Sequence, residues 1–237
     1  MLRSNCRAQF TADDFQFVVQ TLSKNRKDAV SLVDLLSDEE TRDTVLDHEL
    51  LYAELIDNCD CLRVSPAFYF YILTRRVLRQ AGMEERSLSD YVAGVLVAFS
   101  RRQQLQFSPS GPNNRFCFPY ISDLLEQLST ASSQQAFLIR THVGNYTLFL
   151  SGVFAERVRA HSEHRGGPDL LFYERMGRMN YQMASQHRMA QAASLDKTFH
   201  DLSSHFHDIR CALNDLTDNF LHLSIPSQPE PEGFSPA

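Results

Sequence analysis

The sequence contains no tryptophan, and it has few of the residues that interrupt helices, with nine glycines and nine prolines among 237 residues. Half of these eighteen residues are concentrated in two segments, 109–119 and 226–236. The rest of the chain therefore has only two prolines and seven glycines. Inside a helix a proline costs about 3 kcal/mol and a glycine about 1 kcal/mol, so few residues there oppose helix formation. The chain is also long enough to bury a hydrophobic core without disulfides or a metal.

An excess of positive charge is absent as well. The chain has 23 Lys and Arg residues against 29 Asp and Glu residues, a net charge of −6. Because affinity for nucleic acids comes largely from neutralising phosphates, this balance argues against a nucleic-acid partner. The basic pairs Arg75-Arg76 and Arg101-Arg102 fall at the polar ends of predicted helices, where cations interact favourably with the helix dipole.

Long apolar runs are missing too. The first residues contain no apolar run of the kind found in a signal peptide, and the apolar stretch 143–155 is too short for a membrane span. The five cysteines are odd in number and follow no disulfide framework, which favours free thiols in a reducing cytoplasm. The sequence therefore predicts a cytoplasmic protein that does not associate with membranes.

Repeated helix signals predict an all-α fold, an irregular bundle of about eight or nine helices. Apolar residues recur at helical spacing in segments 11–22, 28–36, 37–57, 65–82, 87–102, 120–129, 133–160, 168–193 and 195–222. We expect residues 1–223 to form a single helical domain, followed by a disordered, proline-rich tail at 224–237. Residues 103–118 favour a flexible surface connection or a binding loop, or alternatively a small β-hairpin.

Several of these helices carry end signals. A Ser or Thr precedes an acidic residue by three positions at three helix starts, which predicts capping boxes at Thr11–Asp14, Ser37–Glu40 and Ser87–Asp90. In the segment 65–82, Pro66 falls at the first helical position and Gly82 just past the last. This asymmetry is typical of the two ends of a helix.

The last predicted helix carries a heptad pattern, which we call the apolar seam. Spacings of four and three alternate along it through Leu195, Phe199, Leu202, Phe206, Ile209, Leu213, Leu216, Phe220 and Leu223. Such a pattern is typical either of the core of an antiparallel bundle or of half of a dimer interface. We favour the core role, but the length of the seam is also consistent with a homodimer.

Five of the nine histidines fall between residues 187 and 222, which raises the question of a metal site. No two of these histidines are four residues apart, the spacing that lets two side chains of one helix bind the same ion. The pair that comes closest to such a site is His207 with Cys211, on the outer face of the helix. We therefore predict a solvated polar face, with no metal and no other cofactor. The preceding helix repeats apolar residues at helical spacing, a pattern typical of adaptable core packing, at Phe172, Met176, Met179 and Met183.

The candidate ligand-binding residues come from segment 137–154, which is nearly all apolar but contains Arg140, His142 and Asn145. On a helix His142 falls at the edge of the apolar sector, where burial would lower its pKa and keep the imidazole neutral. Asn145 could orient His142, and Arg140 could hold a carboxylate or phosphate. Glu174 and Tyr181 on the next helix are candidate partners. A structural hydrogen-bond network is the main alternative to a ligand site.

Two further features of this helix limit the hypothesis. Arg140 and His142 point in directions well over one hundred degrees apart, which counts against a single shared site. Small residues gather on the Arg140 side, which favours the close approach of another helix, at Gly144, Ser151 and Ala155.

Two segments, "RVSPAFYFYILTRRVLRQAG" and "RTHVGNYTLFLSGVF", resemble segments of an uncharacterised family of helical bacterial proteins. The similarity extends from about residue 28 to residue 222. It implies an all-helical fold and carries no activity, cofactor or catalytic residue with it.

Known catalytic motifs are absent, including phosphate-binding glycine loops, nucleophile elbows and paired carboxylate–histidine ligands. The leading hypothesis is a non-enzymatic scaffold or regulatory interaction module that forms a homodimer and binds a protein partner. The alternative is a helical enzyme or small-ligand sensor with a pocket around His142 and Asn145, so whether the chain is an enzyme stays open.

Overall fold

The computed structural model describes residues 5–57, 63–100 and 121–220, and these residues form helices and the turns between them. The predicted all-α class is confirmed for this part of the chain. The predicted loop or hairpin at 103–118 and the predicted tail at 224–237 lie outside the described residues.

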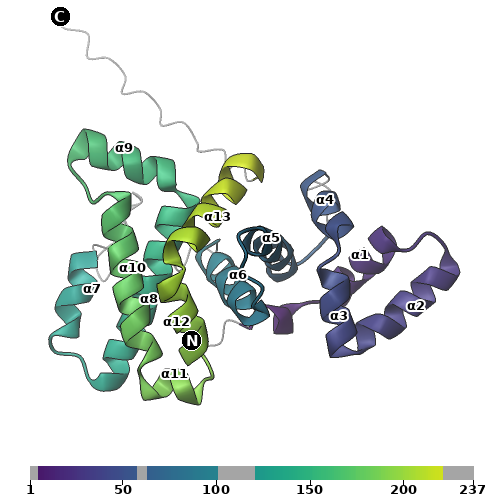
Figure 1. The fold of residues 1–237 in the computed structure, drawn as a ribbon, viewed down its shortest axis with the longest axis horizontal. Helices are drawn as coiled ribbons and strands as arrows, with labels where there is room; N and C mark the ends of the chain where they lie inside the picture. The colour runs from purple at the N-terminus through teal and green to yellow at the C-terminus, as the bar shows by residue number, and fades with distance from the viewer. Residues whose placement is uncertain (1–4, 58–62, 101–120, 221–237) are drawn as a thin grey trace, which may run out of the picture.

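The helices follow one another with short connections (Figure 1). After a 3₁₀ turn, η1 (Arg7–Gln9), they are α1 (Ala12–Leu22), α2 (Arg26–Ser37), α3 (Glu39–Leu46), α4 (Glu49–Asp57), α5 (Pro66–Gln80), α6 (Arg86–Ser100), α7 (Ile121–Leu128), α8 (Ser133–Val153), α9 (Ala155–Arg165), α10 (Leu170–Ser185), α11 (Arg188–Ala192), α12 (Asp196–Ser204) and α13 (Phe206–Phe220).

Two of the predicted helix starts are confirmed. Thr11 and Asp14 form a complete capping box at the start of α1, and the Ser65 hydroxyl accepts from the Phe68 N–H at the start of α5, with Pro66 in the first turn. Gly82 follows α5 with a φ of 81°, a left-handed conformation that glycine adopts without strain.

The other two predicted capping boxes are wrong. Asp38, not Ser37, caps α3, because its carboxylate accepts from the Thr41 N–H. Asp90 lies inside α6, where its carboxylate accepts from the backbone N–H of Arg7, far away in the sequence. Spacing alone did not distinguish a capping side chain from one engaged in a tertiary contact.

Four predicted helices are each broken in two, so the described residues form thirteen α-helices and not eight or nine. The breaks fall at His48, Phe154, His187 and His205. At His48 and His187 the ring Nδ1 accepts a hydrogen bond from the backbone N–H two residues later, which caps the following helix. The apolar spacing continues across these breaks, so the pattern did not reveal them.

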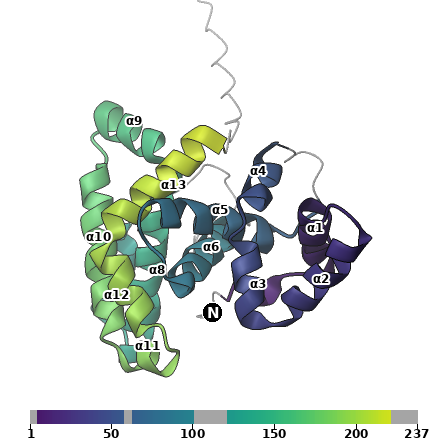
Figure 2. The same cartoon turned by 45° about the vertical axis from the view of Figure 1, so that its right-hand side comes forward.

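The helices enclose two clusters of buried side chains. The N-terminal cluster lies between α1–α4 and one face of α5 and α6, and it includes Val18, Leu51 and Phe68. The main cluster lies between the other face of α5 and α6 and the helices α7–α13. The α5–α6 pair therefore stands in the middle of the molecule and contributes to both clusters, as two views show (Figures 1 and 2).

The apolar seam is part of this main cluster. Its members from Phe199 to Leu216 are at most 1% exposed, although the helix breaks at His205 into α12 and α13. The seam packs inside its own chain, as we favoured, and is not left open for a dimer.

The helices α8 and α10 pack closely through small residues. A Cβ added to Gly144 would lie 2.8 Å from the Tyr181 ring, and one added to Gly177 would overlap Phe206 and lie 2.7 Å from Thr147 Oγ1. Real Cβ atoms do not approach neighbours so closely, so the two helices touch at a separation that glycine permits. The sequence predicted that another helix would approach the side of α8 that carries small residues, and this is confirmed.

Candidate functional site

The five candidate residues lie on the adjacent helices α8 and α10, but the structure does not bring them into one site. Arg140 and His142 project in different directions from α8, as the helical spacing predicted. Asn145, which we expected to orient His142, has its Oδ1 against Tyr91 and Tyr181. On α10, Glu174 and Tyr181 are seven residues apart, which separates them by about two turns. They fall into four environments.

Asn145, which is itself partly exposed, is the centre of a hydrogen-bond network with two buried tyrosines. Its Oδ1 accepts from the hydroxyls of Tyr91 and Tyr181, each at 2.8 Å. Burial raises the pKa of both tyrosines above the ordinary value, so their hydroxyls stay protonated and act as donors. Of the two candidate partners on α10, Tyr181 contacts Asn145, and the network joins α6, α8 and α10.

Tyr91 is the residue of this network that we did not predict. It lies on α6, 54 residues before Asn145, and its ring packs edge-on against Tyr181 and Phe199. Its place on the apolar face of α6 indicated burial, and a buried tyrosine needs a hydrogen-bond partner. Nothing in the sequence indicated which partner it would find.

His142 lies in an aromatic environment at the edge of the main cluster. Its ring is 6.0 Å from Phe99 and 6.2 Å from Tyr146, measured between centroids. Burial lowers its pKa, as expected for a cation removed from water, so the imidazole is neutral at pH 7. The predicted direction of the shift is confirmed.

Arg140 extends towards α10. Its guanidinium donates to Asn180 Oδ1 at 3.5 Å, and the amide of the buried Asn180 donates to the Met176 carbonyl. Arg140 therefore joins two helices and does not share a site with His142.

Glu174 faces α13 instead of Asn145. One of its carboxylate oxygens lies 3.1 Å from His207 Nδ1 and 3.5 Å from Arg210 Nε. The other ring nitrogen of His207 lies 3.7 Å from Cys211 Sγ. The sequence paired His207 with Cys211 on one face, but it did not indicate that Glu174 would join them.

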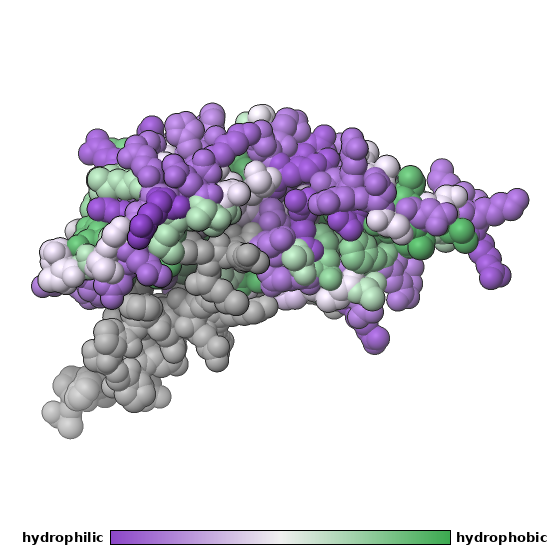
Figure 3. All heavy atoms as spheres, turned by 90° about the horizontal axis from the view of Figure 1, so that it is seen from below, coloured by the Kyte–Doolittle hydropathy of each residue, from purple (hydrophilic) through white to green (hydrophobic). Residues whose placement is uncertain are grey.

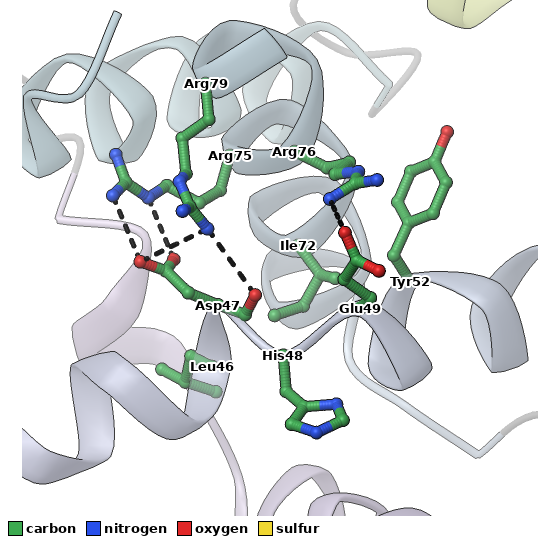
Figure 4. Close-up of a pocket in the computed structure, with 9 residues that line it drawn as sticks. All are labelled: Leu46, Asp47, His48, Glu49, Tyr52, Ile72, Arg75, Arg76 and Arg79. Carbon is green, nitrogen blue, oxygen red and sulfur yellow. Dashed lines mark hydrogen bonds and ion pairs between the residues drawn. The ribbon is translucent and has the colours of Figure 1, made fainter.

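A second charged cluster lies where α3 and α4 meet the end of α5 (Figure 4). The guanidinium of Arg75, only 4% exposed, donates to both carboxylate oxygens of Asp47 and to the Glu84 carbonyl. Arg86 bonds the same carboxylate at 2.9 Å. Burial alone would raise the pKa of Asp47, but the hydrogen bonds and charges of the arginines lower it below its ordinary value.

The hollow beside these arginines is too small for a ligand. It holds about 10 Å³, enough for roughly one water molecule, whereas ligand pockets usually enclose about 300–1,000 Å³. The carboxylates of Asp47 and Glu49 already pair with Arg75, Arg79 and Arg76, and His48 points away from them (Figure 4). These ion pairs join α3 and α4 to α5 and have a structural role.

Another hollow of about 230 Å³ opens between the end of α9 and the start of α10. It is lined by charges of both signs, including Arg159 and Glu163, and by Leu170 and Leu171. Its volume is also below the usual range for ligand pockets. Neither hollow borders His142 or Asn145.

The surface also has an exposed apolar stripe, which we call the α10 stripe, formed by Phe172, Met176, Met179 and Met183. Phe172 is 37% exposed, Met179 and Met183 are each 44% exposed, and Met176 is partly buried. The prediction that these residues fill the core is therefore wrong for three of the four. Helical spacing showed that they share a face, but not that this face points to solvent.

Apolar residues also reach the surface at the opposite end of the molecule. On α2, Val30 is 60% and Val33 is 53% exposed. Seen from below, the surface is mostly hydrophilic, and apolar residues are exposed at this end of the molecule as well as elsewhere (Figure 3).

None of the helices in the described residues is long and apolar enough to cross a membrane. Within residues 5–57, 63–100 and 121–220, no three or more His, Cys, Asp and Glu side chains are grouped to hold a metal ion. Comparisons with protein-family models, with curated proteins and with solved structures find no match to this chain.

Proposed function

We propose that the chain is a non-enzymatic scaffold or regulatory interaction module that forms a homodimer through the α10 stripe. The observation that carries this proposal is the exposure of the stripe, with two methionines and a phenylalanine open to solvent on one face of α10. Contiguous exposed apolar side chains commonly mark protein interaction surfaces, and methionine adapts readily to the shape of a partner.

The spacing of the stripe favours a second copy of the same chain as the partner. Its residues are separated by four, three and four positions, which reads the same in both directions. If two α10 helices cross antiparallel about a twofold axis, Phe172 of one copy meets Met183 of the other. Met176 then meets Met179. A twofold interface needs such a self-complementary surface, so the symmetry of the spacing supports a homodimer.

The charges beside the stripe are compatible with this pairing. Arg175 flanks it on one side, and in the antiparallel arrangement it faces the polar Gln182 of the second copy, so no like charges meet. The dimer in this proposal is thus mediated by α10 and leaves the apolar seam in the core of each chain.

The second hypothesis, an enzyme or ligand sensor around His142 and Asn145, has less support. The Asn145 carbonyl oxygen is already engaged by two buried tyrosines, and neither described hollow reaches this region. A cytoplasmic location and a further protein partner stay part of the proposal. The free thiols of Cys6 and Cys211 support the first of these.

Sedimentation of the purified protein at micromolar concentrations tests the dimer. Met179 lies next to the proposed twofold axis, so Met179→Lys would place two cations close together at the interface. We expect it to weaken dimerisation about a hundredfold or more, since every 1.4 kcal/mol changes an affinity tenfold. Val33→Lys, a change of similar exposure on α2, is the matched control and should leave the dimer intact.

Two results would contradict the proposal. A wild-type protein that stays monomeric across micromolar concentrations would rule out the homodimer. A dimer lost in Val33→Lys but kept in Met179→Lys would place the interface on α2 and rule out the α10 stripe. Thermal unfolding of each variant checks that the fold is unchanged.

A further inference from the structure

The cluster of Cys211, His207 and Glu174 has the geometry of an activated thiol. Cys211 Sγ lies 3.7 Å from His207 Nε2, and His207 Nδ1 lies 3.1 Å from Glu174 Oε2. The three groups are therefore arranged in the order nucleophile, base and orienting carboxylate. This order defines nucleophilic sites in proteins, where the first contact is often long before a substrate binds.

The carboxylate determines which nitrogen of His207 carries a proton. Glu174 accepts from Nδ1–H, which leaves the lone pair of Nε2 directed at the sulfur. Arg210 adds a fixed positive charge, because its NH2 group donates to Cys211 Sγ at 3.2 Å and its Nε pairs with Glu174. The sulfur therefore has a proton acceptor on one side, His207 Nε2, and a cation on the other, Arg210.

Cys211 and His207 are at least partly exposed to solvent, whereas the two charged residues beside them are largely shielded from it. The His207 side chain is 59% exposed and Cys211 is partly exposed. The side chains of Glu174 and Arg210 are only 14% and 9% exposed, so their positions are set by packing between α10 and α13. Cys211 is thus partly open to solvent, while two of the groups beside it are held in place by packing.

We propose that Cys211 is a nucleophilic thiol that reacts with hydrogen peroxide. His207 Nε2 accepts the thiol proton, and the resulting thiolate attacks one peroxide oxygen. An S–O bond forms as the O–O bond breaks, and the departing hydroxide takes the proton from His207 to leave as water. The sulfur loses two electrons and becomes a sulfenic acid, while the peroxide is reduced.

The surroundings of the sulfur favour a small neutral reactant over an anionic one. At one hundred degrees per residue, Asp215 and Asp218 project from the same side of α13 as Cys211, and both are exposed. Asp208 lies on the edge of that face. These carboxylates disfavour the approach of anionic disulfides or acyl phosphates, whereas hydrogen peroxide carries no charge.

Cys6 provides an internal reference within the same molecule. Its side chain is buried, its thiol donates to the Ala67 carbonyl, and burial raises its pKa to about 12. A buried thiol of this kind is unreactive in the folded protein. A difference in reaction between Cys211 and Cys6 therefore reports the local environment and not the total thiol content.

The test treats the folded 237-residue chain with hydrogen peroxide and traps sulfenic acid with dimedone, followed by peptide mass spectrometry. We expect the adduct on Cys211 and not on Cys6. His207→Ala should slow its formation by about tenfold or more, the effect of losing a general base. His205→Ala, another exposed histidine on the outer side of this region, is the matched control and should not change the rate.

Glu174→Gln tests the positioning role of the carboxylate. It should slow the reaction less than His207→Ala, and it should have no further effect when His207 is already alanine. An adduct rate at Cys211 that is the same in wild type and His207→Ala, or no adduct at Cys211, would overturn the proposal. Circular dichroism of each variant separates a loss of chemistry from a loss of fold, and iodoacetamide labelling of Cys211 repeats the comparison with a second reagent.

Discussion

Replacing Asn145 with alanine distinguishes a structural network from a ligand site. The substitution removes the oxygen that accepts from Tyr91 and Tyr181, and both tyrosines are buried in the main cluster. Each hydroxyl would then lack the partner it has in the folded protein, and both belong to side chains that are at most 3% exposed. An unsatisfied buried polar group costs about 1–3 kcal/mol, so the two together should lower the free energy of unfolding by about 2–6 kcal/mol.

Urea unfolding followed by circular dichroism measures this loss. Tyr91→Phe is the matched control, because it removes one hydrogen bond while Asn145 Oδ1 still accepts from Tyr181; its expected cost is about 1 kcal/mol. Adding Tyr91→Phe and Tyr181→Phe to Asn145→Ala removes the unsatisfied hydroxyls and should recover part of the lost stability. If Asn145→Ala alone unfolds within about 0.5 kcal/mol of the wild type, the network does not hold the core and our reasoning fails.

Two further predictions concern the same helices. Gly177→Ala should destabilise the protein by about 1–3 kcal/mol, because the added Cβ overlaps Phe206. The same change in an open helix stabilises a protein by about 1 kcal/mol. A higher stability of the variant in urea unfolding would therefore disprove the close contact. For His142, burial lowers the folded-state pKa, so the unfolded chain binds the proton more readily and stability should fall as the pH drops below about 6.5. His142→Leu should flatten that pH dependence in thermal unfolding, and an unchanged slope would mean that another group causes it.

The sequence predicted the fold class and the buried seam because both depend on repeated local patterns. Phe199, Leu202 and Phe206 each reinforce the same period, and so their burial could be inferred without knowing any neighbour. The stripe of Met179 and Met183 shows the limit of this reasoning. Periodicity identifies residues that share a face, whereas the choice between core and solvent depends on which other helices pack there.

The candidate site was predicted only in part for a related reason. Helical geometry correctly separated Arg140 from His142, because both lie on one helix and their directions follow from its pitch. Tyr91 and Asn145 are 54 residues apart, and Glu174 and His207 are 33 apart, so their contacts depend on tertiary packing. The breaks at His48 and His187 were missed because a histidine ring, which is not a typical capping group, supplies the acceptor there.

The central position of α5 and α6 has a consequence for how the molecule opens. One face of the α5–α6 pair packs against the first four helices, and its opposite face packs in the main cluster. The pair can therefore stay folded on the main cluster when the first four helices detach. Arg75 and Asp47 join the two parts across this boundary. We therefore expect residues 5–57 to unfold as a separate cooperative unit, with slow amide exchange persisting in the helices of the main cluster. We do not expect the reverse order, because losing α5 and α6 removes the support of both clusters at once.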